Sequence, residues 1–509
     1  MKKTLCLALA IFMCLSTLAM AACGTNTDTP PANDVTYEVV TNPEQNQEEE
    51  DTANLDYACG LPDDLDFGGD SINFLFADRP GREDELVSEG GLNSGAIGSA
   101  VYERNVTVEE QLKVSLEMIP NTTDSVAADL KLDYQSGTCE YDLIADGTYK
   151  AIIPVIEGCY KDLNQTEYVD TSKHYWTQGY NDMVTFTTNH KQYLVTGAAA
   201  ISLFRYMYLT IYNAEMFNEY QLPDLYETVR NGDWTLDYQF QIIQDVYTDT
   251  SGNSQNDADD FHGFVTGDTI SVDPYMVASD LHMIIKDQET RDLVYNAAAV
   301  STLSDLCDKV QALYNNENTY VFKTATYDDV GQNYIIEKFA SEKAMMATIL
   351  FYNMETNYNE VGALEYGIAP MPKFSTDQKD YHSYVQDQVT GFGISAGVKD
   401  DRMDMCSAAL EAIGYHSHML VRPAYYETTL SERYMKNPES QEILDTIFDT
   451  LSFDFSSTCG NIVTSLVIRD TLRPLLSGSS NKIASTAKSW ERTMARQLER
   501  YNEKLAALN

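Results

Sequence analysis

Short apolar runs alternate with amphipathic stretches from about residue 60 to the end of the chain. Runs of this length predict buried strands, and apolar residues that recur every three or four positions predict helices packed against them. Strands that alternate with helices indicate parallel sheets covered on both faces, so the expected fold class is α/β. The expected strands are 71–77, 116–119, 141–145, 192–195, 206–212, 344–351, 366–369 and 391–395.

Two helices can be placed more closely. The Gly-rich turn 90–95 leads into a long helical stretch through Val101, Val108, Leu112 and Val114. The final stretch, 483–508, reads as one helix with apolar residues at helical spacing. These residues are Trp490, Met494, Leu498 and Tyr501, and we expect Trp490 to lie in the core.

The first residues of the chain predict export. Lys2 and Lys3 precede an apolar run, 5–22, that ends in small residues, as in a secretory signal peptide spanning 1–22. Cys23 follows two alanines and resembles the lipobox of bacterial lipoproteins, which implies lipidation of Cys23 and cleavage before it. An uncleaved anchor is the alternative, because 18 apolar residues could just cross a bilayer. In both cases we expect the body at the extracellular face of the membrane.

The segment after Cys23 predicts a tether. Residues 24 to 58 carry nine acidic residues and no Lys or Arg. Such a segment cannot bury enough apolar surface to fold, so we expect 23–58 to be a disordered acidic tether with a root-mean-square span of roughly 30 Å. The folded body is then expected over 59–509.

The charge of the chain excludes some partners. With 34 Lys+Arg against 78 Asp+Glu, the formal net charge is −44. This argues against nucleic-acid binding and against attachment to anionic lipid through basic patches. Tyrosine is abundant, at 34 residues against 18 Phe and 3 Trp, which suits polar, hydrated ligands. Composition alone allows an exported enzyme or an exported binding protein.

The cysteines allow disulfides without requiring them. After Cys23 six remain, an even number in an extracytoplasmic setting. Cys139 and Cys159 are the closest pair in sequence, and buried free thiols are the alternative. No C-x-x-C occurs, so zinc-ribbon and thioredoxin-type sites are not supported. The six are Cys59, Cys139, Cys159, Cys307, Cys406 and Cys459.

The loop 249–260 has the spacing of a calcium loop. Oxygen-bearing side chains occupy positions 1, 3, 5, 9 and 12, and position 7 offers a backbone carbonyl, as in an EF-hand. A serine replaces the glycine of position 6, and an aspartate replaces the glutamate of position 12. We expect a structural calcium site, and a polar turn is the alternative. The expected ligands are Asp249, Ser251, Asn253, Gln255, Asp257 and Asp260.

No sequence feature marks an enzyme. The segment 393–397 fits G-x-S-x-G, but a triad with Ser395 needs a later histidine, and only His416 and His418 follow. Two residues apart on a helix, these histidines face different ways and make no metal pair. No pair of carboxylates has flanking sequence typical of a glycosidase. We therefore expect a protein without catalytic residues or an organic cofactor.

Six segments occur in the order found in family 1 of the extracellular solute-binding proteins, the substrate-binding lipoproteins of ABC importers in Gram-positive anaerobes. The resemblance covers roughly 68–505. It implies a two-lobe, periplasmic-binding-protein-like α/β fold (type II) with a hinge and an inter-lobe cleft. By this analogy the first lobe is about 60–206 and 366–415, and the second about 207–365 and 416–509. The segments are 100–114, 141–144, 226–235, 366–373, 377–381 and 425–430.

The resemblance also implies a function. It implies a monomer that captures a carbohydrate or oligosaccharide, delivers it to an ABC permease and is held at the membrane by its lipid anchor. A secreted carbohydrate-active hydrolase and a surface adhesin or sensor ectodomain are the alternatives. The absence of a catalytic signature favours binding.

The ligand-binding residues are expected at strand ends and at the hinge. Sugar recognition uses aromatic planes for the C–H faces of the ring and amide or carboxylate groups for its hydroxyls. We expect Trp234, just before a helix, to pack in the core. The candidates are Asp146, Tyr149, Phe351, Tyr352, Asn353, Tyr384, Gln386, Asp387, Tyr425 and Tyr426.

Overall fold

The computed structural model describes residues 59–91, 94–122, 125–323, 329–426, 430, 435, 437–462 and 468–508. The predicted signal peptide, the lipidated Cys23 and the acidic tether lie outside these residues. The described residues belong to one compact unit. None of its described helices combines the length and apolar character that a bilayer-crossing helix needs.

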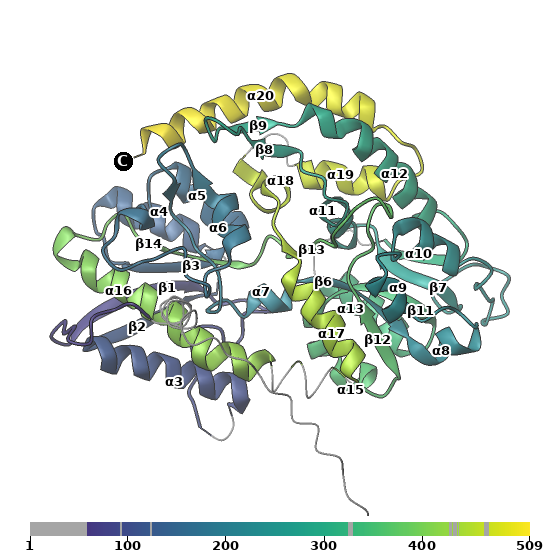
Figure 1. The fold of residues 1–509 in the computed structure, drawn as a ribbon, viewed down its shortest axis with the longest axis horizontal. Helices are drawn as coiled ribbons and strands as arrows, with labels where there is room; N and C mark the ends of the chain where they lie inside the picture. The colour runs from purple at the N-terminus through teal and green to yellow at the C-terminus, as the bar shows by residue number, and fades with distance from the viewer. Residues whose placement is uncertain are drawn as a thin grey trace, which may run out of the picture. The chain divides into compact units, whose positions relative to one another are not determined.

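The first sheet is mostly parallel and defines the first lobe. Its strand order is β14-β3-β1-β2, with β1 parallel to β2 and β3 and β14 antiparallel to β3. Helices α4 and α5 lie on one face, and α3 and α16 on the other (Figure 1). The bounds are β1 Asp70–Ala77, β2 Val114–Asn121, β3 Leu143–Gly147, β14 Thr390–Ile394, α3 Gly95–Leu112, α4 Val126–Ser136, α5 Thr148–Ile156 and α16 Asp400–His416.

The second sheet is mixed and defines the second lobe. Its order is β10-β7-β11-β6-β12; β10, β7 and β11 are parallel, and β6 runs antiparallel to both of its neighbours. All seven residues of β11 are buried, which explains its uninterrupted apolar sequence. The bounds are β6 Tyr208–Asn213, β7 His262–Gly267, β10 Thr319–Phe322, β11 Ala344–Leu350 and β12 Tyr366–Ala369.

One boundary differs from the expected division of the lobes. The analogy assigns 366–415 to the first lobe, but β12 pairs with β6 in the second sheet. The reason is that the outer edge of β6 offers hydrogen bonds to β12, whereas β14 finds its partner in β3. The chain therefore crosses between Ala369 and Thr390 rather than at residue 366.

Most of the predicted elements are present. The expected strand 192–195 is shorter: β5 covers Lys191–Gln192, and Val195 makes a single bridge to Phe392. The first long helix ends at Leu112, because Lys113 turns into the left-handed conformation and Val114 begins β2. The last helix is α20, Ile483–Ala507, and its Trp490 is buried in the core as expected.

The remaining elements are short and connect or cover the sheets. They are β4 Thr185–Phe186, β8 Ile284–Lys286, β9 Leu293–Tyr295, β13 Ser383–Tyr384, β15 Leu451–Ser452, α6 Gln178–Val184, α7 Ser202–Arg205, α8 Ala214–Glu219, α9 Leu225–Arg230, α10 Leu236–Ile242, α11 Pro274–Ala278, α12 Val300–Tyr314, α13 Asp329–Ala340, α14 Phe351–Thr356, α15 Tyr358–Val361, α17 Pro438–Asp449, α18 Phe455–Thr458 and α19 Ile468–Leu476.

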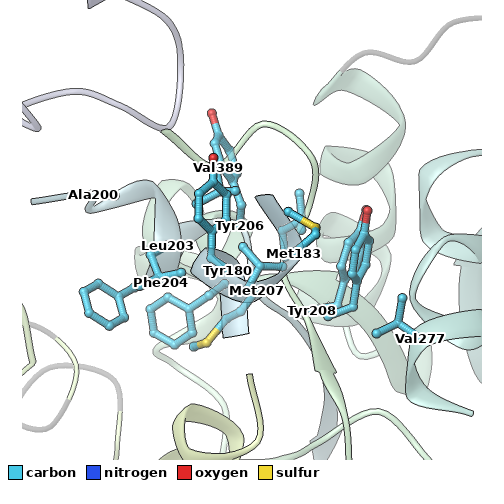
Figure 2. Close-up of a cluster of buried hydrophobic side chains, with 14 of the residues drawn as sticks. Tyr180, Met183, Ala200, Leu203, Phe204, Tyr206, Met207, Tyr208, Val277 and Val389 are labelled. Carbon is cyan, nitrogen blue, oxygen red and sulfur yellow. The ribbon is translucent and has the colours of Figure 1, made fainter. Parts of the chain in front are cut away.

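Three stretches of chain connect the two sheets. They run from α7 to β6, from β12 to β14 and from α16 to α17. The first two are joined by a bridge between Met207 and Val385 and by a 2.9 Å bond from the Gln386 N–H to the Tyr206 carbonyl. Tyr208 and Tyr384 stack at 5.7 Å within this crossing, and Figure 2 shows the buried cluster around it. These hydrogen-bonded segments form the junction between the lobes.

The described cysteines carry free thiols, so of the two alternatives for Cys139 and Cys159 the structure has the free thiols and not the disulfide. The Cys139 side chain packs instead against the backbone of Gly397, where an added Cβ would lie 2.8 Å from its sulfur. Burial raises the pKa of Cys159 and Cys307 to about 11. These thiols therefore behave as small apolar side chains of the core.

A carboxyl group is buried in the first lobe. Glu411, on α16, accepts hydrogen bonds from the Tyr175 hydroxyl, from the Trp176 indole at 3.2 Å and from the Asp170 backbone N–H at 3.2 Å. Burial raises the pKa of Glu411 from 4.5 to about 7. The folded protein therefore holds a proton here, between about pH 4.5 and 7, that the unfolded chain has released.

Replacing Glu411 with glutamine removes this pH dependence. The extra proton of the folded state makes wild-type stability fall as pH rises from about 4.5 to 7, and the loss persists above pH 7. We expect Glu411→Gln to raise the free energy of unfolding at pH 8 by about 2 kcal/mol and to flatten its pH profile. Urea unfolding at pH 5 and pH 8 measures this. Glu103→Gln, at an exposed site on α3, is the control, and equal profiles for wild type and Glu411→Gln would contradict the prediction.

Candidate functional site

A cavity of about 460 Å³ lies between the two sheets. The loop after β1, the start of α5 and the turn after β7 line it, so it sits at the carboxyl ends of parallel strands from both sheets. The crossing segments and α19 complete its wall. The lining residues are Arg79, Pro80, Tyr149, Tyr206, Ile270, Gln386, Asp387, Gln388, Arg469, Asp470 and Arg473.

Tyr149 presents an aromatic surface in this cavity, which Tyr206 also lines. The guanidinium of Arg469, from α19, lies over the Tyr149 ring, 4.8 Å from the centroid. Arg469 also bonds the carboxylate of Asp387 and, at 3.1 Å, that of Asp470. Tyr149 comes from the first lobe, Arg469 from the second and Asp387 from a crossing segment. An aromatic face, a carboxylate and a guanidinium therefore meet where the lobes meet.

A buried ion pair supports α19 beside the cavity. The Arg473 Nε donates to Asp273 Oδ1 at 2.6 Å, and its Nη2 bonds the second oxygen. Both side chains are buried. Burial alone lowers the pKa of Arg473, but the Asp273 carboxylate outweighs it and raises this pKa above the ordinary value. The pair fixes the helix that carries Arg469.

Two arginines of the loop after β1 hold the crossing segment. Arg79 donates to the Gln388 side-chain oxygen at 3.1 Å, and Arg82 donates to the Gln388 carbonyl at 2.6 Å. Arg82 also lies 3.7 Å from the Asp146 carboxylate, and both groups are buried. Gly147 leaves room for this arrangement, because an added Cβ would lie 2.5 Å from the Arg82 guanidinium.

The structure brings three of the predicted ligand residues together. Tyr149, Gln386 and Asp387 line the cavity, and Asp146 lies behind its wall against Arg82. Tyr384 is fully buried against Tyr208.

Phe351 and Asn353 of α14 are buried as well. The Asn353 side chain accepts the Leu350 N–H at 3.0 Å, so it serves to begin the helix. These two side chains are structural.

The other predicted residues lie near a second, more acidic cavity of about 370 Å³. Tyr352 lines it and donates to Glu83 at 3.0 Å, and Arg205 bonds Glu355 at 2.8 Å. Tyr425 is buried, stacks on Phe204 and donates to Glu355; the Tyr426 hydroxyl accepts the Gln441 amide at 2.7 Å. The full lining is Glu83, Asp84, Ser94, Gly95, Ala96, Ile97, Arg205, Tyr352, Glu355 and Thr356.

Sequence reasoning missed the arginines of the first cavity. Arg469 and Arg473 follow no predicted strand, and α19 is far in sequence from the first-lobe residues that line the cavity. Their spacing of four residues, which places both on one helix face, is the signal that could have found them. Arg79, two residues after β1, lies at a strand end, the position that predicts ligand residues elsewhere in the chain.

The calcium-type loop is hydrogen-bonded to itself. Asp249 accepts the N–H groups of Gly252 at 2.6 Å and Ser254 at 2.9 Å, and Asp260 accepts those of Ser251 and Asp257, both at 3.1 Å. Although burial opposes it, these bonds lower the pKa of Asp260. In the described part of the chain, no group of three or more His, Cys, Asp or Glu is arranged to hold a metal ion. The hydrogen bonds within the loop hold it in a closed turn.

Calcium binding therefore stays a prediction from the spacing. A calcium site predicts that EDTA lowers the melting temperature of the protein and that added calcium restores it. The Asp257→Ala variant should lose this response, because it removes a ligand from a half-buried position. A melting temperature that neither EDTA nor calcium changes would identify the loop as a polar turn.

The G-x-S-x-G segment has no catalytic surroundings. Ser395 is buried, and its hydroxyl accepts the Gly397 N–H at 3.2 Å. His416 contacts the Gln111 side chain at 2.7 Å, whereas His418 lies 3.0 Å from His174, so the two histidines face different ways as predicted. Trp234 is buried and donates to the Pro370 carbonyl at 2.8 Å, which confirms its expected packing role.

Solved structures share this fold at low sequence identity. The maltose/maltodextrin-binding domain MalE of Bdellovibrio bacteriovorus, bound to maltotriose, has a TM-score of 0.50 and 14% identity over 85% of this chain and 99% of its own. The galacto-N-biose/lacto-N-biose I-binding protein of the ABC transporter of Bifidobacterium longum, in complex with lacto-N-biose, has a TM-score of 0.54 and 12% identity over 85% of this chain and 98% of its own. The GacH receptor of Streptomyces glaucescens, solved unliganded and with acarbose, has a TM-score of 0.50 and 14% identity over 87% of this chain and 100% of its own.

These similarities show the fold. The chain has the two-lobe, periplasmic-binding-protein-like α/β fold. No protein-family model matches the sequence, and no curated protein matches it.

Proposed function

We propose that this chain is a substrate-binding protein that captures a carbohydrate between its two lobes and delivers it to an ABC importer. The observation that carries this proposal is the cavity at the strand ends, where Tyr149, Asp387 and Arg469 come together from both lobes and the crossing. Its volume of about 460 Å³ lies within the range of small-molecule sites, roughly 300–1,000 Å³. The sugars bound to the structural neighbours support the proposed class of ligand.

The lining chemistry suits a sugar. The ring of Tyr149 can pack against the C–H face of a pyranose, while Gln386, Asp387 and Gln388 offer amide and carboxylate groups to hydroxyls. Arg469 covers the Tyr149 ring in this structure, so a sugar that stacks there takes the place of the guanidinium. Arg469 bonds Asp387 and Asp470 through Nη1 and Nε, so its Nη2 can donate to the ligand.

The binding mechanism is a shift in population between open and closed forms. A ligand that contacts Tyr149 in the first lobe and Arg469 in the second makes both sets of contacts only when the lobes are close. It therefore stabilises the closed form, which the permease recognises. With Cys23 lipidated and 24–58 acting as a tether, the body would work at the extracellular face of the membrane. No step of this mechanism breaks a bond in the ligand.

Calorimetry against a panel of mono-, di- and oligosaccharides and peptides tests the proposal, with analysis of products in the same mixtures. Saturable sugar binding without turnover is the expected result. Released product would favour a hydrolase, and the absence of any small ligand would favour an adhesin or sensor; either result overturns the proposal.

A further inference from the structure

The C-terminal helix carries a row of cations. Lys or Arg recurs at every fourth position along α20 for five positions, in a chain whose net charge is −44. Each step of four residues rises about 6 Å and turns about 40° beyond a full turn, so the row is continuous. Its members are Lys488, Arg492, Arg496, Arg500 and Lys504, which we call the basic row.

The basic row faces solvent. All five side chains are exposed, while the apolar residues of α20 are buried on the opposite face. Within the described residues, none of the five is ion-paired, whereas most arginines elsewhere are, including Arg205, Arg402 and Arg473. The row therefore keeps its charge available to a partner.

The acidic residues of α20 lie on another side. Glu491, Glu499 and Glu503 line a groove between α20 and β9, together with Asp292. No member of the basic row lines this groove. Each glutamate follows a member of the basic row by three residues, but no ion pair joins the two sets in the described part of the chain. Like charges four residues apart cost about 0.2–0.5 kcal/mol per pair, so the row itself lowers the stability of the helix.

We propose that the basic row binds a flexible single-chain polymer with a phosphate on each repeat, as a local exception to the net charge of −44 that disfavours nucleic acid elsewhere on the chain. Two observations select this partner. None of the large exposed apolar side chains in the described residues lies on α20, which disfavours a protein interface or insertion into a bilayer. The row also winds by about 160° over its length, so a flat membrane meets only its middle, whereas a flexible chain can follow it.

Anisotropy of labelled long-chain inorganic polyphosphate with the full chain tests this proposal at low ionic strength. We expect saturable binding that weakens with salt, with a slope of log K against log salt of about −3. The Arg492→Glu/Arg496→Glu/Arg500→Glu variant should bind at least about tenfold more weakly, and the three corresponding Arg→Lys changes should retain binding. If the Glu variant melts early, the three Arg→Gln changes, which remove charge without reversing it, should still weaken binding several-fold.

The matched control carries the same change in net charge at three exposed lysines away from α20: Lys113→Glu/Lys379→Glu/Lys399→Glu. It should bind within about twofold of wild type in about 0.1 M salt, where the Debye length is about 10 Å and contact with a polyanion is local. Equal losses in the two variants, no binding by wild type, or preferential binding to anionic phospholipid vesicles would each overturn the proposal.

Discussion

The Tyr149→Ala variant is expected to bind its sugar about 30-fold more weakly than wild type, a loss of about 2 kcal/mol. Tyr149 supplies an aromatic face of the cavity between the lobes, and alanine offers no ring for a pyranose to pack against. The fold should survive, because the change removes a cavity wall rather than a core residue. Calorimetry with the best sugar from the panel measures the loss.

Tyr134→Ala is the matched control for this experiment. Tyr134 lies on α4 with 38% of its surface exposed, away from the cavity, so the same chemical change should leave the affinity unaltered. Equal affinities for wild type and Tyr149→Ala would show that the sugar binds elsewhere.

The Asp273→Ala variant is expected to lose about 3 kcal/mol in free energy of unfolding. Asp273 pairs with Arg473 through both carboxylate oxygens, and both side chains are buried. Alanine leaves the buried Arg473 charge without its two-pronged partner, while the Asp470 carboxylate stays at 3.2 Å. Urea unfolding of wild type and variant measures the difference.

Glu442→Ala is the comparison for the buried pair. Glu442 also meets an arginine through two bonds, Arg230 at 2.7 and 3.0 Å, but on the exposed surface. Water and salt screen such a pair, so we expect a loss below about 1 kcal/mol. Similar losses in the two variants would show that burial does not set the strength of the Asp273–Arg473 pair.

Local pattern was sufficient to predict most of the fold. The strand at 344–351 reads as uninterrupted apolar sequence because β11 is covered on both faces, and α20 is visible from its helical spacing. The point at which the chain crosses from the second sheet back to the first was not predictable in the same way. Residues 366–369 could pair with either sheet, and only the free edge of β6 decides the outcome.

The candidate site was predictable in part for a physical reason. Tyr149 could be found because polar residues after a parallel strand lie at the ligand edge of a sheet. The same rule failed for Phe351 and Asn353, because residues that begin a helix directly after a strand can turn into the core. Arg469 could not be found, since its contact with Tyr149 joins residues more than 300 positions apart.

Small-angle X-ray scattering with and without the best-binding sugar measures whether the two lobes close around a ligand. We expect the radius of gyration to fall on ligand addition, with half of the fall reached at the dissociation constant measured by calorimetry. Tyr149→Ala should not show this fall at the same sugar concentration. A scattering profile that stays the same while calorimetry reports bound sugar would contradict closure of the two lobes around a ligand.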